Sequence, residues 1–496
     1  MSVSSSSVEF GENGIALSAV TVTIFSYYPD VLAKRLIPIE VPSRRNGLLL
    51  QQLALTTPQM PMKYSTTVNP VQSWTRAKPT KPLEVKAKEP PPNKDISPTS
   101  TITKAYKWTN VSSNGNTRLV SAYLDERTLG HPTVFLLGLH KHTVPKENFY
   151  CAFQYPNGTS VCLKSLATQG NLNRGDEKVG KDSWAFGLRC VVPYPLPINV
   201  AVSQNKQCKP PNVSNWIHIS RIESDKSVNF GLCIETPMFG KSIPLNMVIE
   251  GIERNLAFGA GWITVYVQDK NPATMKVLRD YEKQGILEIV EWNLSQNDAS
   301  NSHYYAESVC INDCLYRNMY RARYLIFTDL DEIIVPQTHR NWSEMMTAID
   351  QSNTSAFLFS HSSSMELKGN KTTLQQSYLK NWTCDGKTEI SKYPLPFYIN
   401  HNYRTPPFPY FKEQKATRRK TIVKPIYVQT MGIHASNFRL NKTLQIIVPS
   451  EIGLLNHYRK PPLCQRCKDV LQQNELISHL VPSLFTQIRN KICQYI

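Results

Sequence analysis

The sequence predicts an α/β fold, in which a mostly parallel, Rossmann-like sheet fills the second half of the chain and a β-rich accessory domain precedes it. Three observations support this. Strand-like and helix-like segments alternate from Ser227 to Phe327. Before them, short β-branched and aromatic runs are separated by glycine, proline and asparagine. Finally, the apolar strand Tyr324–Phe327 leads directly into the acidic run Thr328–Glu332.

Length and charge narrow the class of protein. The 496 residues suffice for one large domain with accessory parts or for two to three domains, and 41% hydrophobic residues can bury a core. The net charge of +18 suits an anionic partner such as a phosphate-bearing substrate. Because the basic residues are dispersed and no nucleic-acid motif occurs, nucleic acid is the least favoured partner.

The first 103 residues are predicted to lie outside the folded domains. Residues 1–30 contain the apolar run Gly14–Tyr28, which is shorter than the roughly twenty residues of a membrane span. No lysine or arginine precedes this run, whereas Lys34 and Arg35 follow it. A weak signal-anchor, a cryptic signal sequence and an atypical gene start remain open. Residues 31–103 interleave prolines and lysines without apolar periodicity, which is typical of an extended stem.

Residues 104–225 are predicted to form the β-rich accessory domain. Four runs are expected to be strands: Arg118–Leu124, Thr133–Leu139, Asn148–Gln154 and Trp216–Ile222. Four cysteines are available to staple them: Cys151, Cys162, Cys190 and Cys208. His140 and His142 have the spacing of a ligand pair, but a surface loop at a strand end is the favoured interpretation.

Residues 226–462 are predicted to form the α/β domain, and residues 463–496 a C-terminal tail. Strands are expected at Val228–Ile234, Trp262–Val267, Ile286–Val290 and Tyr324–Phe327. Helices are expected at Leu245–Phe258, Pro272–Lys283 and His303–Tyr320. Such alternation implies right-handed crossovers and a parallel sheet with a nucleotide-type crevice. Neither G-x-G-x-x-G after the first strand nor G-x-x-x-x-G-K-[ST] occurs, which disfavours a dinucleotide site and a P-loop.

The acidic run after the last of these strands is the principal candidate site. Ligands of open α/β sheets bind beyond the carboxyl ends of strands, where Asp329 and Asp331 are expected. Residues two apart on an extended chain point the same way, so the two carboxylates can share one target. Hard oxygen ligands suit Mg²⁺ or Mn²⁺ bridged to a diphosphate. The alternative is an acidic turn at a strand end, although charges between two apolar runs are costly without a cationic partner.

Further candidates follow in the last part of the chain. The segment Ala416–Gln429 is expected to be a basic turn that enters a strand. Its cations Arg418, Arg419 and Lys420 either contact phosphates or form a solvated turn. His434 and His457 are expected at strand ends and are candidates for a third metal ligand.

Cysteines and glycosylation motifs favour the secretory pathway. The chain has eleven cysteines but no two C-x-x-C motifs at zinc spacing, and Cys464-x-x-Cys467 fits a disulfide or two thiols better than a metal site. Nine asparagines lie in N-x-S/T motifs: Asn110, Asn157, Asn212, Asn293, Asn341, Asn353, Asn370, Asn381 and Asn441.

A series of short motifs along the chain resembles the motifs of a known family. The ordered motifs are Cys233-x-x-x-Pro237, Gly259-Ala260, Tyr281-x-x-x-Gly285, Glu291-Trp292, Asn312–Leu315, Phe327–Glu332, Lys420–Val423 with Pro425, Gly432-x-His434 and His457–Arg459. In this order and spacing the chain resembles glycosyltransferase family 92, once catalogued as a domain of unknown function. The members it is most similar to are vertebrate β-1,4-galactosyltransferases that extend the terminal galactose of N-glycans.

The resemblance implies a fold, a reaction and a location. It implies a GT-A fold, UDP-galactose as donor, a glycan acceptor on glycoproteins, and a Golgi-luminal catalytic domain on a single-pass type II anchor. Mn²⁺, or Mg²⁺, would be held against the UDP diphosphate by Asp329 and Asp331, with His457 as third ligand and His434 in reserve. Lys420 is assigned to cofactor binding.

An inverting transfer also needs a carboxylate to accept the proton of the acceptor hydroxyl. Asp385 is the candidate, and Glu366 and Glu389 are comparable. Two other classes remain as alternatives. The run around Asp329 is similar to the first motif of haloacid-dehalogenase-type phosphatases, in which that aspartate would be the nucleophile. A non-catalytic luminal sugar-binding protein is the second alternative.

Overall fold

The computed structural model describes much of the chain from Lys104 onwards, and all described residues belong to the compact unit 93–496. They are residues 104–111, 115–127, 131–141, 148–169, 172, 183–208, 215–222, 228–238, 243–365, 372–384, 388–390, 393–401, 403–405, 407, 419–458, 472–473 and 480–495. The expected anchor (1–30) and stem (31–103) lie outside them. None of the helices in the described part is long and apolar enough to cross a membrane.

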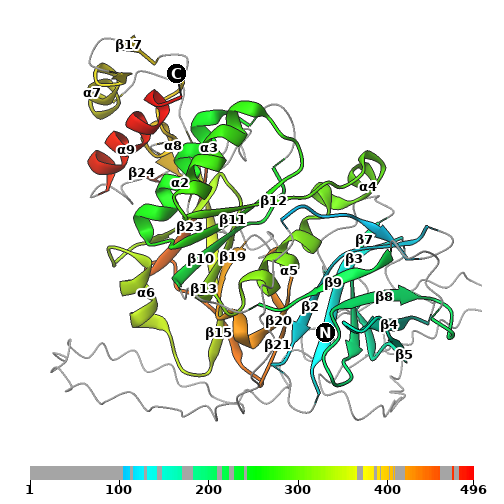
Figure 1. The fold of residues 1–496 in the computed structure, drawn as a ribbon. Helices are drawn as coiled ribbons and strands as arrows, with labels where there is room; N and C mark the ends of the chain where they lie inside the picture. The colour runs from blue at the N-terminus through cyan, green and yellow to red at the C-terminus, as the bar shows by residue number, and fades with distance from the viewer. Residues whose placement is uncertain are drawn as a thin grey trace, which may run out of the picture. The chain divides into compact units, whose positions relative to one another are not determined.

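Residues 109–220 form a nine-stranded sheet with the order β5-β4-β8-β9-β2-β3-β7-β6 and with β1 paired to β2 (Figure 1). Neighbouring strands are antiparallel except β2 and β9, which are parallel. The strands are β1 (Thr109–Asn110), β2 (Thr117–Asp125), β3 (Thr133–His140), β4 (Tyr150–Gln154), β5 (Ser160–Lys164), β6 (Ala167–Gln169), β7 (Trp184–Val191), β8 (Asn199–Ser203) and β9 (Ile217–Ser220). The four expected strands are confirmed as β2, β3, β4 and β9.

Both faces of β3 are buried. Along β3, Val134 and Leu136 pack into a core shared with β4 and β8, whereas Phe135 and Leu137 pack into a second core shared with the α/β domain. Alternate residues of a strand point to opposite faces, so β3 must be apolar throughout. Disulfides Cys151–Cys190 and Cys162–Cys208 staple the sheet, as expected.

His140 does not lie in a surface loop, and that expectation is wrong. It is the last residue of β3 and only 1% exposed, with Nδ1 2.8 Å from Thr117 Oγ1. The apolar strand extends one residue further than expected and carries the ring into the core. His142 lies outside the described residues.

The α/β domain contains an eleven-stranded sheet with the main order β12-β11-β10-β13-β19-β15-β18-β24. β10 (Val228–Ile234), β11 (Trp262–Val267), β12 (Leu287–Glu291) and β13 (Ala322–Thr328) are parallel, as predicted. β19 (Arg419–Val423) pairs antiparallel with both β13 and β15 (Thr354–Met365). The other strands of this sheet are β14 (Glu332–Pro336), β18 (Tyr403–Arg404), β22 (Leu444–Ile447), β23 (Gly453–Tyr458) and β24 (Gln472–Gln473). Two separate two-stranded sheets are formed by β16 (Thr383–Cys384) and β17 (Thr388–Glu389), and by β20 (Val428–Met431) and β21 (Ser436–Arg439).

Helices cover both faces of the parallel strands. The helices α2 (Leu245–Phe258) and α3 (Pro272–Lys283) pack in one core, and α5 (Glu307–Asn318) packs in the other, which it shares with β2 and β3. Both α2 and α3 have the predicted bounds. The other helical segments are α4 (Gln296–Asn301), η2 (His303–Tyr305), α6 (Trp342–Ile349), α7 (Thr373–Lys380), α8 (Phe397–Asn400), η3 (Pro425–Tyr427) and α9 (Val481–Cys493).

The expected helix His303–Tyr320 is wrong at its start. The regular helix begins only at Glu307, because Tyr304, Tyr305 and Ala306 have positive φ angles. Left-handed residues break the hydrogen-bond ladder of a right-handed helix.

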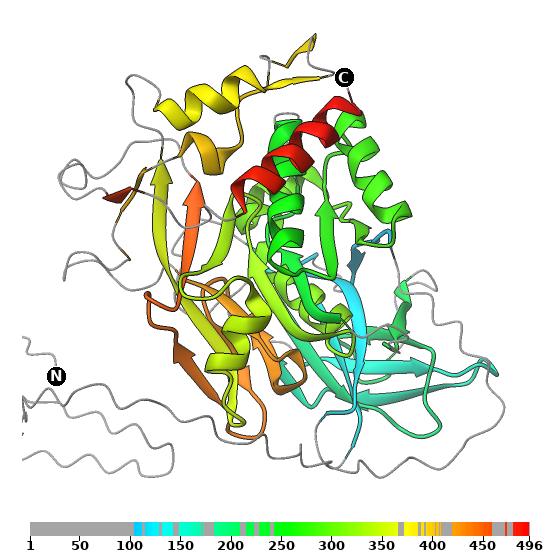
Figure 2. The same ribbon diagram turned by 90° about the vertical axis from the view of Figure 1, so that its left-hand side faces the viewer.

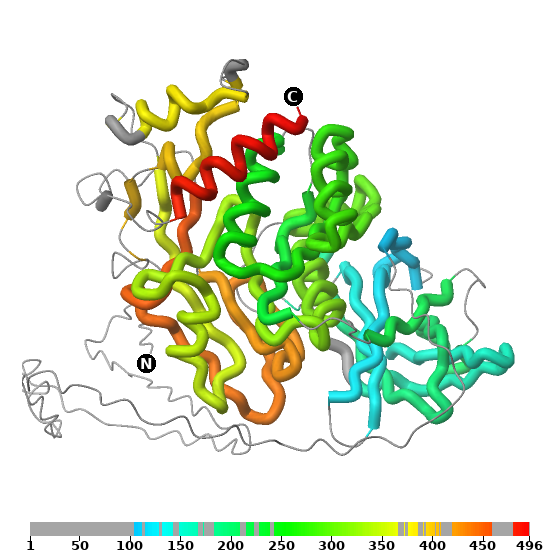
Figure 3. Tube along the Cα trace, turned by 60° about the vertical axis from the view of Figure 1, so that its left-hand side comes forward, coloured from blue at the N-terminus to red at the C-terminus, as the bar shows by residue number. Residues whose placement is uncertain are grey.

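The C-terminal segment is part of the α/β domain's packing. Helix α9 lies along α2, and its residues Leu484 and Ile488 belong to the main core (Figures 2 and 3). Disulfide Cys384–Cys493 ties its end to β16. A further disulfide, Cys233–Cys314, links β10 to α5.

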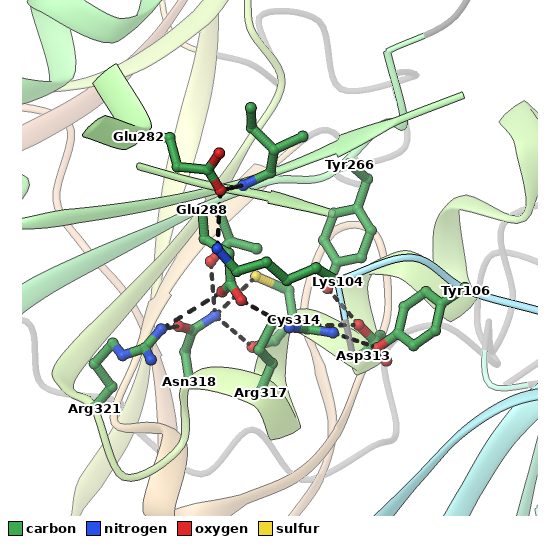
Figure 4. Close-up of polar contacts among 12 residues, drawn as sticks. Lys104, Tyr106, Tyr266, Glu282, Glu288, Asp313, Cys314, Arg317, Asn318 and Arg321 are labelled. Atoms are coloured by element: carbon green, nitrogen blue, oxygen red, sulfur yellow. Dashed lines mark hydrogen bonds and ion pairs between the residues drawn. The ribbon is translucent and has the colours of Figure 1, made fainter. Parts of the chain in front are cut away.

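A buried polar network joins the N-terminal segment to α5. Asp313 on α5 accepts hydrogen bonds from Tyr106 at 2.7 Å and from Tyr266 at 2.6 Å (Figure 4). Arg317, one turn later, lies 2.9 Å from Glu288 and donates to the Tyr106 hydroxyl at 2.6 Å. The network is complete only when both parts of the chain are present.

Candidate active site

The order of the parallel strands reverses beside β10, and the acidic motif lies at that point. β11 and β12 extend the sheet on one side of β10, whereas β13 pairs with the other side. Such a reversal leaves a ligand-binding crevice at the carboxyl ends of the strands. β10 ends at Ile234 and β13 at Thr328, so Glu235 and Asp329 follow neighbouring strands at this edge. The predicted position of Asp329 beyond a strand end is confirmed.

Asp329 is held by a hydroxyl and an ammonium group. Its Oδ1 accepts a hydrogen bond from Thr236 Oγ1 at 2.7 Å, and its Oδ2 lies 3.0 Å from Lys420 Nζ. Lys420 comes from β19 and is only 3% exposed. The same ammonium group contacts Glu235 and lies 3.4 Å from Glu332 Oε2. One buried lysine is thus shared by three carboxylates.

Burial and shared charge shift the pKa values in this cluster. Burial raises the pKa of Glu235 well above its usual value, and Lys420 opposes this only in part. For Asp329, burial is outweighed by Lys420 and by the hydrogen bond from Thr236, so its pKa is lowered. Burial alone would lower the pKa of Lys420, but the surrounding carboxylates outweigh it and raise that pKa well above its usual value. Asp329 and Lys420 therefore stay charged around neutral pH.

A second pair of strands brings His457 to Asp331. β14 and β23 are antiparallel, with Glu332 opposite His457. His457 Nε2 lies 3.2 Å from Asp331 Oδ2, and its Nδ1 lies 3.2 Å from both Glu332 Oε1 and His361 Nε2. The sequence analysis assigned Asp331 and His457 to one site, and in the structure their side chains are in contact.

Two functional candidates were missed by sequence reasoning. Glu307 Oε1 lies 3.3 Å from Thr236 Oγ1, and its Oε2 lies 3.2 Å from His303 Nδ1. Glu235, Glu307 and Asp329 each offer an oxygen, all within 4.8 Å of one another. Glu235 directly follows a strand, as Asp329 does, so the strand-end argument would have found it. Glu307 gives no such signal, because it only begins a helix.

These elements surround a pocket of about 520 Å³. Four carboxylates line it: Glu307, Asp329, Asp331 and Glu332. Arg419 and Lys420 supply positive charge, and Glu235 contacts Lys420. Five carboxyl groups thus lie near two cationic side chains among the described residues, and burial raises the pKa of three of them: Glu235, Glu307 and Glu332.

Residues 228–494 match the family model described as glycosyltransferase family 92. The chain belongs to this family. The match begins at the first residue of β10 and ends just after α9, so it contains every site residue above and excludes the β-rich domain. Membership of family 92 confirms the family resemblance seen in the sequence and supports a glycosyltransferase, whereas the similarity to β-1,4-galactosyltransferases stays a prediction. A comparison with curated proteins found no significant match.

The donor set of this family 92 member fits a divalent cation. Mn²⁺ accepts both carboxylate oxygens and imidazole nitrogens as ligands, whereas Mg²⁺ prefers oxygens. Glu235 is 1% exposed, and among the described residues no hydrogen-bond partner reaches its Oε1. A buried carboxylate oxygen without a donor is costly unless a cation satisfies it.

The remaining predicted residues have different outcomes. His434 lines the pocket, but its Nδ1 lies 3.1 Å from the carbonyl oxygen of Arg419, which is a structural contact. Arg419 also lines the pocket. Asp385, Glu366 and Arg418 lie outside the described residues, and so does the side chain of Glu389. The assignment of a catalytic base to Asp385 stays a prediction.

Proposed function

We propose that this family 92 transferase moves galactose from UDP-galactose to a terminal galactose of glycoprotein N-glycans, forming a β-1,4 linkage with inversion. The carboxyl-rich pocket at the strand reversal supports a nucleotide-sugar donor bound through a cation, and galactose, the acceptor and the linkage follow from the resemblance to family 92. A nucleotide diphosphate is itself anionic, and the sequence offers it neither a P-loop nor a dinucleotide fingerprint. An acidic pocket holds such a ligand only with a cation between them.

Mn²⁺, or Mg²⁺, fits that role. Asp329 and Asp331 would hold it with His457 as the third ligand, and Glu235 and Glu307 offer further oxygens near Asp329. When bound, such an ion supplies Lewis-acid neutralisation of the charge on departing UDP.

The chain's own residues prepare this pocket. Lys420 and Thr236 orient the Asp329 carboxylate and keep it ionised. His457, held between Asp331 and Glu332, fixes the Asp331 side chain. An inverting transfer further needs a base for the acceptor hydroxyl, and we assign this role to Asp385.

We propose the Golgi lumen as the compartment. Four disulfides among the described cysteines fit an oxidising compartment, and the nine N-x-S/T motifs fit the same pathway. Residues 1–30 would supply the single-pass type II anchor.

UDP release by the full chain, with UDP-galactose, a galactose-terminated N-glycan and Mn²⁺, tests the proposal. We expect release that depends on the acceptor, disappears on chelation, and falls at least about 100-fold in Asp329→Ala and Asp331→Ala, since each removes a proposed metal ligand. Asp350→Ala is the matched control, because Asp350 pairs with Lys424 and does not line this pocket.

Two further measurements refine or refute the substrate assignment. A donor panel of UDP-galactose, UDP-glucose and UDP-N-acetylgalactosamine should favour UDP-galactose, and NMR of the product should show a β-1,4 linkage. Release that is unaffected by chelation and by both aspartate variants would refute the metal-dependent mechanism.

A further inference from the structure

A turn beside the pocket has an uncommon backbone conformation. Tyr304, Tyr305 and Ala306 have φ angles of 35°, 58° and 65°. Positive φ is unfavourable for any residue with a side chain, and three in succession are therefore strained. Strain of this kind persists only where the surroundings fix it, and it concentrates at functional sites.

Buried neighbours hold the turn. Trp292 is fully buried, and its Nε1 donates a hydrogen bond to the carbonyl oxygen of Tyr305 at 2.7 Å. Ala306 is buried, and its carbonyl oxygen accepts from the backbone N–H of Val309 at 2.9 Å, in the first turn of α5. Two contacts to the backbone carbonyl groups of Tyr305 and Ala306 therefore help to hold the turn.

The strained turn places the Tyr304 side chain at the pocket. Tyr304 is 56% exposed and lines the pocket together with His303 and Glu307. The rings of His303 and Tyr304 meet edge to face, with centroids 4.3 Å apart and an interplanar angle of 89°. The His303 imidazole is in turn fixed by Glu307. The Tyr304 ring is therefore packed against His303 and still largely exposed at the pocket.

The pocket offers both apolar and polar groups to a ligand. Its apolar lining consists of Ile234, Pro237, Met238, Ile243, Met247, Leu330, Ile433 and Leu455. Its imidazole rings and cations are His303, His361, His434, His457, Arg419 and Lys420. A nucleobase has flat apolar faces, whereas an acceptor sugar presents hydroxyl groups that need hydrogen-bonding partners. The carboxylates of the same lining, with a bound cation, would hold the diphosphate.

We propose that Tyr304 is the stacking platform for the nucleobase of the nucleoside diphosphate-sugar donor. The inference rests on the proposed function and deepens it, because it assigns the donor's base to a named side chain of the pocket. Base–aromatic stacking depends on the ring and not on the hydroxyl group.

Isothermal titration calorimetry on the full chain tests this role. It compares the affinity for UDP with the affinity for ribose 5-diphosphate, which lacks the base, at one fixed Mn²⁺ concentration. Tyr304→Leu and Tyr304→Phe both keep a Cβ and hence the same backbone strain. We expect Tyr304→Leu to weaken UDP binding about fivefold or more and to leave ribose 5-diphosphate unchanged. Tyr304→Phe should bind both as the unchanged chain does.

Tyr427→Leu is the matched control, since this partly exposed tyrosine does not line the pocket. Equal UDP affinity in Tyr304→Leu and the unchanged chain would overturn the inference, as would an equal loss for both ligands. If the unchanged chain binds UDP no better than ribose 5-diphosphate, the base is not recognised and the inference falls. If it binds neither ligand, the proposed donor class itself is wrong.

Discussion

Lys420 is the residue on which the charge balance of the site depends. Its ammonium group is buried and touches Glu235, Asp329 and Glu332. Buried carboxylates that lose their counter-ion are strongly destabilising, and they take up protons in compensation. Lys420 thus allows the fold to keep an acidic pocket before any divalent cation binds.

Lys420→Met should therefore lower the free energy of unfolding by roughly 3 kcal/mol or more. Mn²⁺ should raise the melting temperature of this variant more than that of the unchanged chain, because the ion restores positive charge among the same carboxylates. Thermal unfolding with and without Mn²⁺ measures both effects.

Lys424→Met provides the comparison, since Lys424 follows the same strand but pairs with Asp350, 2.5 Å away and outside the pocket. Its response to Mn²⁺ should match that of the unchanged chain. An equal Mn²⁺ shift in both lysine variants would contradict the proposed role of Lys420.

At the scale of elements, the segment before β1 pairs with β12, the edge strand of the α/β sheet. The backbone N–H of Tyr106 donates to Glu291 at 2.9 Å, and that of Glu291 donates to Lys104 at 2.7 Å. Burial raises the pKa of the Tyr106 hydroxyl, which therefore keeps its proton and donates to Asp313. A segment that precedes the matched family region in sequence is thereby built into its core.

Tyr106→Phe should lower the free energy of unfolding by about 1–3 kcal/mol. The substitution removes one donor to the buried Asp313 carboxylate and the acceptor of an Arg317 hydrogen bond, but keeps the ring that packs edge to face on Trp292. Urea unfolding measures the loss. Tyr150→Phe, at a half-buried tyrosine in β4, should change it by less than about 0.5 kcal/mol, and similar losses in both variants would count against the network.

The success of sequence reasoning also differs from element to element. β10, α2, β11 and α3 have the bounds expected from their apolar periodicity, because one face of each helix and both faces of each strand are buried. β7 was missed because Gly187 and Arg189 interrupt its apolar run. In the structure Gly187 accommodates the Phe135 ring, which a Cβ would approach to 2.8 Å, and Arg189 is neutralised by Asp125.

In the candidate site, too, sequence reasoning could predict some residues and not others. The placement of Asp329, Asp331 and His457 in one pocket could be predicted, because the first two follow a strand and the third lies in a motif of the family; their role as metal ligands stays a prediction. The left-handed turn at Tyr304 could not be predicted, since no glycine marks it and a hydrogen bond from the Trp292 side chain, which local patterns do not show, helps to hold it. The partners of Lys420 likewise depend on β19 returning beside β13, which local patterns do not encode.

At the scale of the whole molecule, a second buried cluster fastens the β-rich domain to the transferase domain. Asp125 at the end of β2 pairs with Arg127 at 2.8 Å and with Arg189 at 3.0 Å. Arg127 also donates to the carbonyl oxygens of Pro425 at 2.9 Å and Val428 at 2.7 Å, in the transferase domain. The orientation of Arg127, and with it these two hydrogen bonds to the transferase domain, depends on the Asp125 carboxylate.

This arrangement makes the stability of the molecule sensitive to acid. Burial alone would raise the pKa of Asp125, but Arg127 and Arg189 outweigh it and hold that pKa well below its usual range. A carboxyl whose pKa is lower in the folded than in the unfolded state stabilises the fold above its unfolded pKa, near pH 4. As the pH falls below that value, the unfolded state binds the proton first and the contribution is lost.

Asp125→Asn, which removes the charge but keeps the size, should lower the free energy of unfolding at pH 7, and the difference from the unchanged chain should shrink as the pH falls from about 5 to 2. Urea unfolding at several pH values measures this difference. Asp280→Asn, at a partly exposed aspartate on α3, should show little difference at any pH. If the deficit of Asp125→Asn stayed constant down to pH 2, its carboxylate would contribute through shape and hydrogen bonding alone, and the charge would not be what links the two domains.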